Sequence, residues 1–170
     1  SADGYAGLCR PFGALTLLGM LMHNPQTMGS FLDYWVCTKH EMGLSGREQE
    51  LLILRMALHY ECNYVWKHHL PVASELGVTQ GELDAVRVLP LNGGFNSRET
   101  ALLLLTDEMV AERNVSKSTW DRCKPHLSDS EVIDLITIVS QYVLFSLTNN
   151  VLRVDVERNL ADIEPLREGI

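Results

Sequence analysis

Three side chains between residues 50 and 69 could move protons or attack an electrophile: Glu50, Cys62 and His69. Glu50 opens a very apolar segment, where a carboxyl group would lose solvation and its pKa would rise, so that it could carry a proton near neutral pH. Cys62 and His69 are seven residues apart, or roughly two helical turns, so both could face one pocket although ~10 Å of helix separates them. The residue types predict acid–base chemistry.

Each candidate also has a purely structural interpretation. Glu50 would be stable in an exposed position near a helix N-terminus, where the helix dipole favours negative charge. A cysteine and a histidine on one helix can equally be a buried inert thiol and a hydrogen-bonded imidazole. Tyr64 and Trp66 suit either a core or a pocket wall. Arg55 could bind a substrate carboxylate through two parallel hydrogen bonds, or it could form a surface or interface salt bridge.

The other cysteines and histidines show no metal or disulfide pattern. The histidines have neither H-x-x-x-H nor H-E-x-x-H spacing, and the adjacent His68 and His69 cannot hold one ion from a single helix. We expect His68 at the surface, and nothing singles out His59. The four cysteines are far apart and form no C-x-x-C pair, so we expect mostly buried free thiols and no bound metal. They are Cys9, Cys37, Cys62 and Cys123.

Helices must position the candidate residues, because no segment shows the sustained alternation typical of a strand. Ser45 and Glu48 form a capping box that starts an apolar helix running from Glu50 to Tyr60. A short break at 61–63 and a second helix at 64–76, ended by Gly77, follow.

Helical spacing, breakers and two further capping boxes, Thr79 with Glu82 and Ser128 with Glu131, predict more helices on both sides of this unit. In the last long helix we expect Val132, Ile133, Leu135, Ile136, Val139, Tyr142 and Val143 to face inward. Residues 92–94 are expected to form a loop, and the tail after Asn150 a final helix or a partner-binding arm. The fold class predicted is all-α, a single-domain helical bundle of about seven helices over residues 1–170. The further helices are predicted at residues 9–22, 25–40, 79–88, 97–113, 116–125 and 128–147.

Composition excludes several classes of partner. The 170 residues are 46% hydrophobic and carry a formal net charge of -8, with no block rich in lysine and arginine. Binding to nucleic acid or to an anionic membrane needs clustered cations, so neither is expected. No apolar run approaches the ~20 residues that span a bilayer, and the start of the chain does not look like a signal peptide. We expect a cytoplasmic protein.

The unit L-S-x-R-E-x-E-L-L-I-L-R, followed by E-C-N-Y-V-W-K-H-H and A-S-E-L-G-V-T, resembles the carboxymuconolactone decarboxylase and alkylhydroperoxidase D-like superfamily. The resemblance covers roughly residues 25–150 and implies an alkylhydroperoxidase D-like fold. Glu50, Cys62 and His69 match the family's Glu, Cys and His. Its peroxidase branch needs a C-x-x-C pair, and Val65 replaces the peroxide-attacking cysteine. The decarboxylase-like branch often has Y-E-W, where this chain has Tyr64-Val65-Trp66.

The resemblance implies a cofactor-independent lyase-type enzyme that decarboxylates a small carboxylated lactone or related carbonyl compound. His69 would be the general acid or base, Glu50 would orient it or relay protons, and Cys62 would be a pocket wall or minor hydrogen-bond donor. Tyr64, Trp66 and Arg55 would bind the substrate. Three alternatives stay open: an isomerase, cyclase or dehydratase on the same scaffold, a single-Cys peroxidase, or an inactive helical binding or oligomerisation module.

The expected assembly is a homo-oligomer. The apolar first segment and Trp35 exceed what one small core needs, and the superfamily that the chain resembles forms trimers or hexamers.

Overall fold

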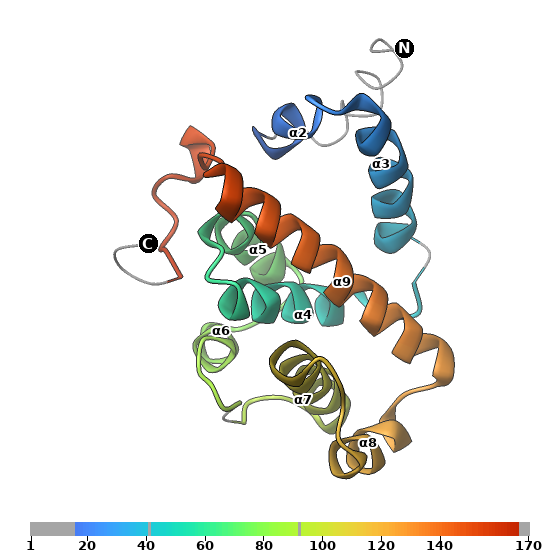
Figure 1. The fold of residues 1–170 in the computed structure, drawn as a ribbon. Coiled ribbons are helices and arrows are strands. Elements are labelled where there is room, and N and C mark those ends of the chain that lie inside the picture. Colours follow the sequence, from blue (N-terminus) through green and yellow to red (C-terminus); the bar gives the residue numbers. More distant parts are fainter. Residues whose placement is uncertain (1–15, 41, 92, 167–170) are drawn as a thin grey trace.

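The computed structural model describes residues 16–40, 42–91 and 93–166, and within these ranges the chain forms eight α-helices and no β-strand (Figure 1). The all-α prediction is confirmed. The start of the predicted first helix and Cys9 lie outside the described residues. The helices are α2 (Thr16–Leu21), α3 (Pro25–His40), α4 (Gly46–His59), α5 (Asn63–Glu75), α6 (Gln80–Val86), α7 (Ser97–Glu112), α8 (Lys117–Cys123) and α9 (Asp129–Leu152).

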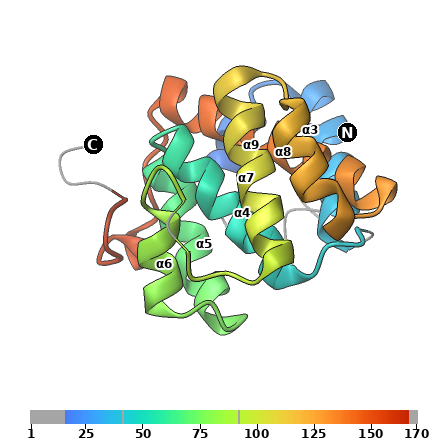
Figure 2. The ribbon, with the colours of Figure 1, turned by 90° about the horizontal axis from the view of Figure 1, so that it is seen from below.

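Helix α4 lies at the centre of the molecule. Every residue from Leu51 to Leu58 is buried, which means that this helix is enclosed on all sides. It contacts α5, α6, α7 and α9, and the two views of the ribbon show it running between α5 and α7 with α9 across it (Figure 1; Figure 2). The apolar run that the sequence predicted to be helical is therefore the core element on which the other helices pack.

Polar capping residues fix where most of the helices begin. In each capping box, the side chain of the cap residue accepts a hydrogen bond from the backbone N–H three residues later. The glutamate at that later position accepts a hydrogen bond from the backbone N–H of the cap residue. The predicted boxes at Ser45, Thr79 and Ser128 are all present. Asn96 forms a further box with Glu99 that the sequence analysis did not identify.

A tight turn joins α4 to α5 at the predicted break. Glu61 has a φ of 48°, in the left-handed region, and the Cys62 amide donates to the Ala57 carbonyl at 2.9 Å. The chain reverses within three residues, so α5 packs against α4. Cys62 becomes the N-cap residue of α5, and Gly77, with a φ of 84°, follows its C-terminal end.

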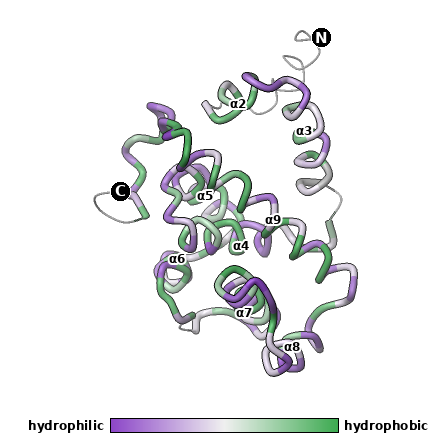
Figure 3. The backbone as a smooth tube through the Cα atoms, viewed as in Figure 1, coloured by the Kyte–Doolittle hydropathy of each residue, from purple (hydrophilic) through white to green (hydrophobic). Residues whose placement is uncertain are grey.

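Helix α9 presents a buried face and an apolar exposed face. Leu135, Val139 and Tyr142 are buried as predicted, but Ile133 and Ile136 are 61% and 41% exposed, so their predicted inward orientation is wrong. Because one side of α9 rests on α3, α4, α5 and α7, the residues on its other side face away from the core. Hydrophobic residues recur along its whole length (Figure 3). The exposed apolar face of α9 consists of Ile133, Ile136, Leu144, Leu147, Val151 and Leu152.

Among the described residues, α9 alone is long and apolar enough to cross a membrane by length and composition. The sequence shows no unbroken apolar run of that length, because uncharged polar residues such as Ser140 and Gln141 interrupt the helix. Core helices meet the same criterion, and α9 buries residues such as Leu135 and Phe145 among the other helices.

The tail after α9 folds back over α5, and residues 153–166 form no further α-helix, so the predicted final helix is absent from this part of the chain. The Lys67 ammonium donates to the Ala161 carbonyl at 2.8 Å, and the Leu166 amide donates to the Asn63 side chain at 2.8 Å. Arg87 and Glu164 form an ion pair at 2.9 Å. These contacts fix the tail beside the helix that carries His69.

Candidate active site

Glu50 and His69 form a short polar contact at the candidate site. Glu50 Oε2 lies 2.6 Å from His69 Nδ1, which joins α4 to α5. The Glu50 side chain is 2% exposed and that of His69 is 17% exposed, so the exposed position considered for Glu50 is wrong. An ionised carboxylate can only accept, so beside it Nδ1 carries the proton, and in the neutral imidazole Nε2 then keeps its lone pair. The arrangement produces an oriented imidazole whose Nε2 can take a proton.

Tyr142 of α9 completes a chain of three polar side chains. Its hydroxyl lies 3.2 Å from His69 Nε2, and the two rings meet edge to face with their centroids 5.3 Å apart. Burial, together with the negative charge of Glu50, raises the pKa of Tyr142 well above its ordinary value. The phenol therefore keeps its proton and donates it to the Nε2 lone pair. The sequence predicted that Tyr142 faces inward, but it did not predict the contact with His69.

A small cavity of about 50 Å³ borders this chain of side chains. A cavity that holds benzene measures about 150 Å³, so a ring-sized ligand requires one wall to move. One wall residue, Leu17, lies on the short helix α2. Two hydrogen bonds hold this helix: the Thr16 amide donates to Glu157 at 2.6 Å, and the Leu17 amide donates to the Tyr64 hydroxyl at 3.3 Å. The wall is mostly apolar and consists of Leu17, Trp35, Tyr64, Val65, His68, His69, Tyr142, Phe145 and Asn149.

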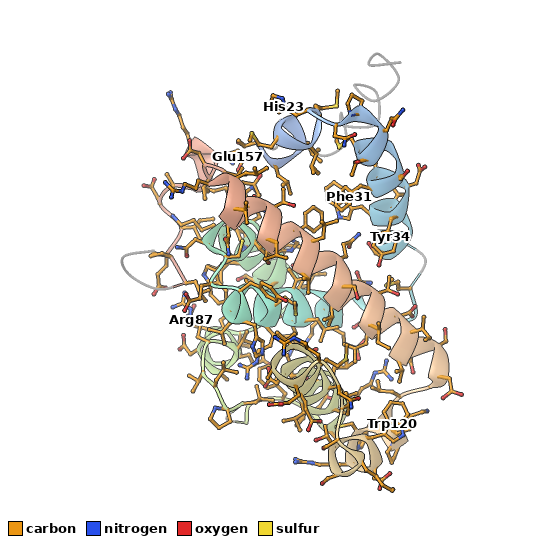
Figure 4. The ribbon with its side chains drawn as sticks, viewed as in Figure 1. His23, Phe31, Tyr34, Arg87, Trp120 and Glu157 are labelled. Carbon is orange, nitrogen blue, oxygen red and sulfur yellow. The ribbon has the colours of Figure 1, made fainter. Side chains whose placement is uncertain are left out.

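Trp35 and Phe31 belong to the core. Trp35 is 9% exposed and meets Phe145 edge to face with centroids 5.7 Å apart. Phe31 and Tyr34 point from α3 towards α9 (Figure 4), where Phe31 contacts Phe145 and the Tyr34 hydroxyl donates to the Thr137 carbonyl at 3.0 Å. The expectation that Trp35 exceeds the needs of one core is therefore not supported by its position.

Cys62 is close in sequence to the cavity but is not part of its wall. Its side chain is completely buried, and burial raises the pKa of the thiol more than the hydrogen bonds at Val65 and Ser146 lower it. A helix N-terminus would favour a thiolate, but here the loss of solvation is the larger effect. Val65, at the position of the missing second cysteine, lines the cavity instead.

Arg55 lies in a separate polar cluster. Its side chain is fully buried and contacts both Asp107 oxygens, at 2.6 and 2.7 Å, and the Val86 and Val88 carbonyls, at 2.6 and 2.7 Å. His59 Nε2 adds a contact of 2.8 Å to Asp107. Burial alone would raise the pKa of Asp107, but these partners hold it below its ordinary value. Arg55 thus joins α4, α7 and the end of α6, and does not line the cavity.

The two aromatic candidates are separated by the fold. Tyr64 lines the cavity, and its hydroxyl donates to Glu157 at 2.8 Å. Trp66 is fully buried and is not part of the cavity wall, and the Arg87 guanidinium lies 4.6 Å from the centre of its ring. Of the six residues singled out from the sequence, Glu50 contacts His69, and only His69 and Tyr64 line the cavity.

His68 was expected at the surface, but it lines the cavity. Its Nδ1 lies 2.7 Å from the Tyr64 carbonyl and its Nε2 lies 2.7 Å from Glu157 Oε2. Burial would raise the pKa of Glu157, but bonds from Thr16 and Tyr64 and the charge of His68 together lower it. Glu157 lies near the C-terminal end of α9 (Figure 4). No local sequence signal indicates this contact, because 89 residues separate Glu157 from His68.

Among the residues that the structure describes, no three histidine, cysteine or acidic side chains are grouped to hold a metal ion.

Comparison with known proteins supports the resemblance seen in the sequence. Residues 25–108 match the model of the carboxymuconolactone decarboxylase family. Among curated proteins, none has a matching sequence. Solved structures with 13–15% sequence identity share the fold.

An uncharacterized peroxidase-related protein from Silicibacter sp. TM1040 superposes with a TM-score of 0.80 at 13% identity, covering 98% of this chain and 88% of that one. A protein of unknown function from Agrobacterium tumefaciens, described as a candidate antioxidant defence protein AhpD, has a TM-score of 0.74 at 15% identity, covering 81% and 94%. The debrominase Bmp8, as a Cys-to-Ala variant in complex with 2,3,4-tribromopyrrole, has a TM-score of 0.71 at 14% identity, covering 82% and 75%.

Proposed function

We infer the function from the premise that this chain belongs to the carboxymuconolactone decarboxylase and alkylhydroperoxidase D-like superfamily. The proposal is a lyase-type enzyme that decarboxylates a small carboxylated lactone or related carbonyl compound without a cofactor, with His69 as the proton carrier. The observation that carries it is the Glu50–His69 contact of 2.6 Å, in which a buried carboxyl group holds the imidazole of a residue that lines a mostly apolar cavity.

The proposed step needs one proton and one electron sink. The bond between the substrate carbon and its carboxylate breaks, CO₂ leaves, and the electron pair moves into the conjugated carbonyl of the substrate. His69 Nε2 takes up one proton from water, and the dienolate then receives this proton on carbon, which restores the neutral imidazole. Glu50 stabilises the imidazolium through Nδ1–H. Because the carbonyl accepts the electrons, the step needs no metal or organic cofactor.

The apolar wall of the cavity favours the loss of CO₂ from the substrate carboxylate. Leu17, Val65 and Phe145 offer no hydrogen bond to a carboxylate, which loses solvation when it enters. The charge spreads over several atoms as CO₂ departs, so an apolar surrounding disfavours the ground state more than the transition state. Arg55 has no part in this proposal, because its hydrogen bonds are made to Asp107 and to backbone carbonyls.

The same pair supports a second candidate reaction, isomerisation of a small carbonyl compound, in which His69 Nε2 removes a proton from one carbon and returns it to another. A debrominase with this fold binds a tribrominated pyrrole, which supports a compact ring as the substrate shape. The single-Cys peroxidase is the weaker alternative, because Cys62 is completely buried and its thiol pKa is raised.

Turnover in a complex metabolite mixture tests the proposal. Purified protein is incubated with a bacterial metabolite extract, and mass spectrometry follows which compounds are consumed. We expect the loss of a carboxylated compound, with a product lighter by CO₂. The rate at which this compound is consumed should fall by roughly 10² to 10⁴-fold in His69→Ala, the usual contribution of a positioned acid or base. Consumption should persist in Cys62→Ala.

His23→Ala is the matched control, since His23 lies exposed between α2 and α3 (Figure 4) and should leave turnover unchanged. A product of unchanged mass would instead support the isomerase. Undiminished turnover in His69→Ala would exclude the proton-transfer role. Activity that needs peroxide and vanishes in Cys62→Ala would establish the peroxidase.

We further propose that a second copy of the chain covers the exposed apolar face of α9, which supports the expected homo-oligomer. Ile133 and Leu147 of that face are 61% and 48% exposed. The double variant Ile133→Glu, Leu147→Glu should shift the protein from a trimer or hexamer to a monomer in size-exclusion chromatography with light scattering, because buried charges oppose association. Leu76→Glu, at a similarly exposed leucine outside α9, should leave the mass unchanged. A monomeric native protein would refute the proposal.

A further inference from the structure

Asn149 has a buried acceptor without a partner. Its side chain is 3% exposed and forms part of the cavity wall. Its Nδ2 donates to the Phe145 carbonyl, one turn earlier on α9, at 2.8 Å. Its Oδ1 is buried and receives no hydrogen bond from any residue that the structure describes. Buried polar atoms are nearly always hydrogen bonded, so an unpartnered oxygen on a residue that lines the cavity points to a ligand as its donor.

The orientation of the amide is determined by its surroundings. The Phe145 carbonyl can only accept, so the nitrogen of the amide must face it. The opposite orientation would set two oxygens against each other and would leave the nitrogen unpaired. The group left for a ligand is therefore an acceptor, which selects a donor and disfavours a carboxylate or an ether at this point.

Asn149 and the acid–base group lie at different positions along the cavity. Tyr142 and Asn149 are seven residues apart on α9, so they occupy one helix face about 10 Å apart. The Tyr142 hydroxyl contacts His69, while Asn149 stands two turns further along. Between them the wall is apolar, with Val65 and Phe145. A ligand that meets both ends must carry an apolar body with a donor at the end away from His69.

We propose that Asn149 Oδ1 accepts a hydrogen bond from the substrate, and that the substrate is a compact, largely apolar ring compound bearing a hydroxyl or a ring N–H. This deepens the proposed function, and rests on it for the statement that the ligand is a substrate. Asn149 then determines specificity: it orients the ring so that the reacting carbon faces His69. The assignment adds to the site a residue 80 positions after His69.

Binding of matched ring pairs tests the proposal without any need for turnover. Phenol is compared with fluorobenzene for the hydroxyl, and pyrrole with furan for the ring N–H, by isothermal titration of the full chain. We expect the donor-bearing ring of at least one pair to bind roughly tenfold tighter, the ratio that one hydrogen bond gives. In Asn149→Leu, which keeps the branched shape of the side chain and removes the acceptor, that ratio should fall to about 1.

Two further variants keep the result interpretable. Asn149→Ala should also abolish the preference, and is expected to fold even if leucine does not fit. Thr148→Ala removes a hydroxyl that bonds to its own helix at Leu144 in the same way, but lies outside the cavity wall. It should preserve the preference. The ratio should also persist in His69→Ala, so a failed proton-transfer role and a failed role for Asn149 give different results.

Equal binding within both pairs by the native protein would overturn the proposal and would mean that only water satisfies Asn149 in the cavity. A preference that survives in both Asn149→Leu and Asn149→Ala would also overturn it, because the donor would then meet another acceptor.

Discussion

Replacing Glu50 with glutamine is expected to lower turnover by roughly 10² to 10⁴-fold while the fold is retained. The carboxylate accepts from His69 Nδ1 at 2.6 Å and so keeps Nε2 free of a proton. The glutamine amide can instead donate to Nδ1. That would move the proton to Nε2 and remove its lone pair. The measurement is kcat for the substrate found in the metabolite experiment, with circular dichroism to verify the fold.

Glu48→Gln is the matched control for this change. Glu48 is also a buried glutamate of α4, but it lies away from the cavity. Its side chain completes the capping box with Ser45 and forms an ion pair with Arg98 at 2.6 Å. Glutamine can replace glutamate in a capping box, so kcat should stay within a factor of about two. If both variants lose activity equally, Glu50 acts only through the stability of α4.

Replacing Asp107 with asparagine is expected to reduce the free energy of unfolding by about 3–5 kcal/mol, because it leaves a fully buried guanidinium without its counter-charge. Arg55 is 0% exposed and faces Asp107 through two contacts of 2.6 and 2.7 Å. Chemical denaturation at neutral pH measures the difference. Asp121→Asn removes the partner of Lys117 in an exposed pair on α8, and its effect should stay within about 0.5 kcal/mol.

The stability that the Asp107 carboxylate contributes should be present at neutral pH and lost at low pH. Its partners hold the pKa of the folded state below the ordinary value of 3.8, despite burial. A carboxyl group with a lowered folded pKa stabilises the protein above its unfolded pKa, and this stability is lost as the pH falls through the folded pKa. The difference between the native protein and Asp107→Asn should therefore be full at neutral pH and shrink below about pH 4. A constant difference down to that range would show that Asp107 acts without its charge.

Local patterns predicted the helices well, because caps and turns depend on residues three or four positions apart. Ser45 with Glu48 and Ser128 with Glu131 are examples, and the left-handed turn at Glu61 coincides with the predicted break. Glu50 and His69 were identified because they lie within one motif. Their direct contact required α5 to pack on α4, which spacing alone does not specify.

The rest of the site depends on contacts between distant segments. Tyr142 meets His69 across 73 residues, and no local pattern separates it from an ordinary core tyrosine. Arg55 was considered for a substrate carboxylate, but Asp107, 52 residues away, occupies its guanidinium. Ile133 and Ile136 were predicted inward because hydrophobicity on one helix does not specify which apolar face meets the core.

The wall of the cavity has two origins along the chain. Trp35, Tyr64, Val65, His68 and His69 lie within residues 25–108, the part that matches the family model. The remaining wall residues lie outside it: Leu17, Tyr142, Phe145 and Asn149. The matched segment thus supplies the proposed proton carrier, while the flanking segments supply much of the shape and the unpartnered acceptor. A scaffold divided in this way can change its substrate through exchanges in its flanks and leave the proposed proton-transfer pair intact.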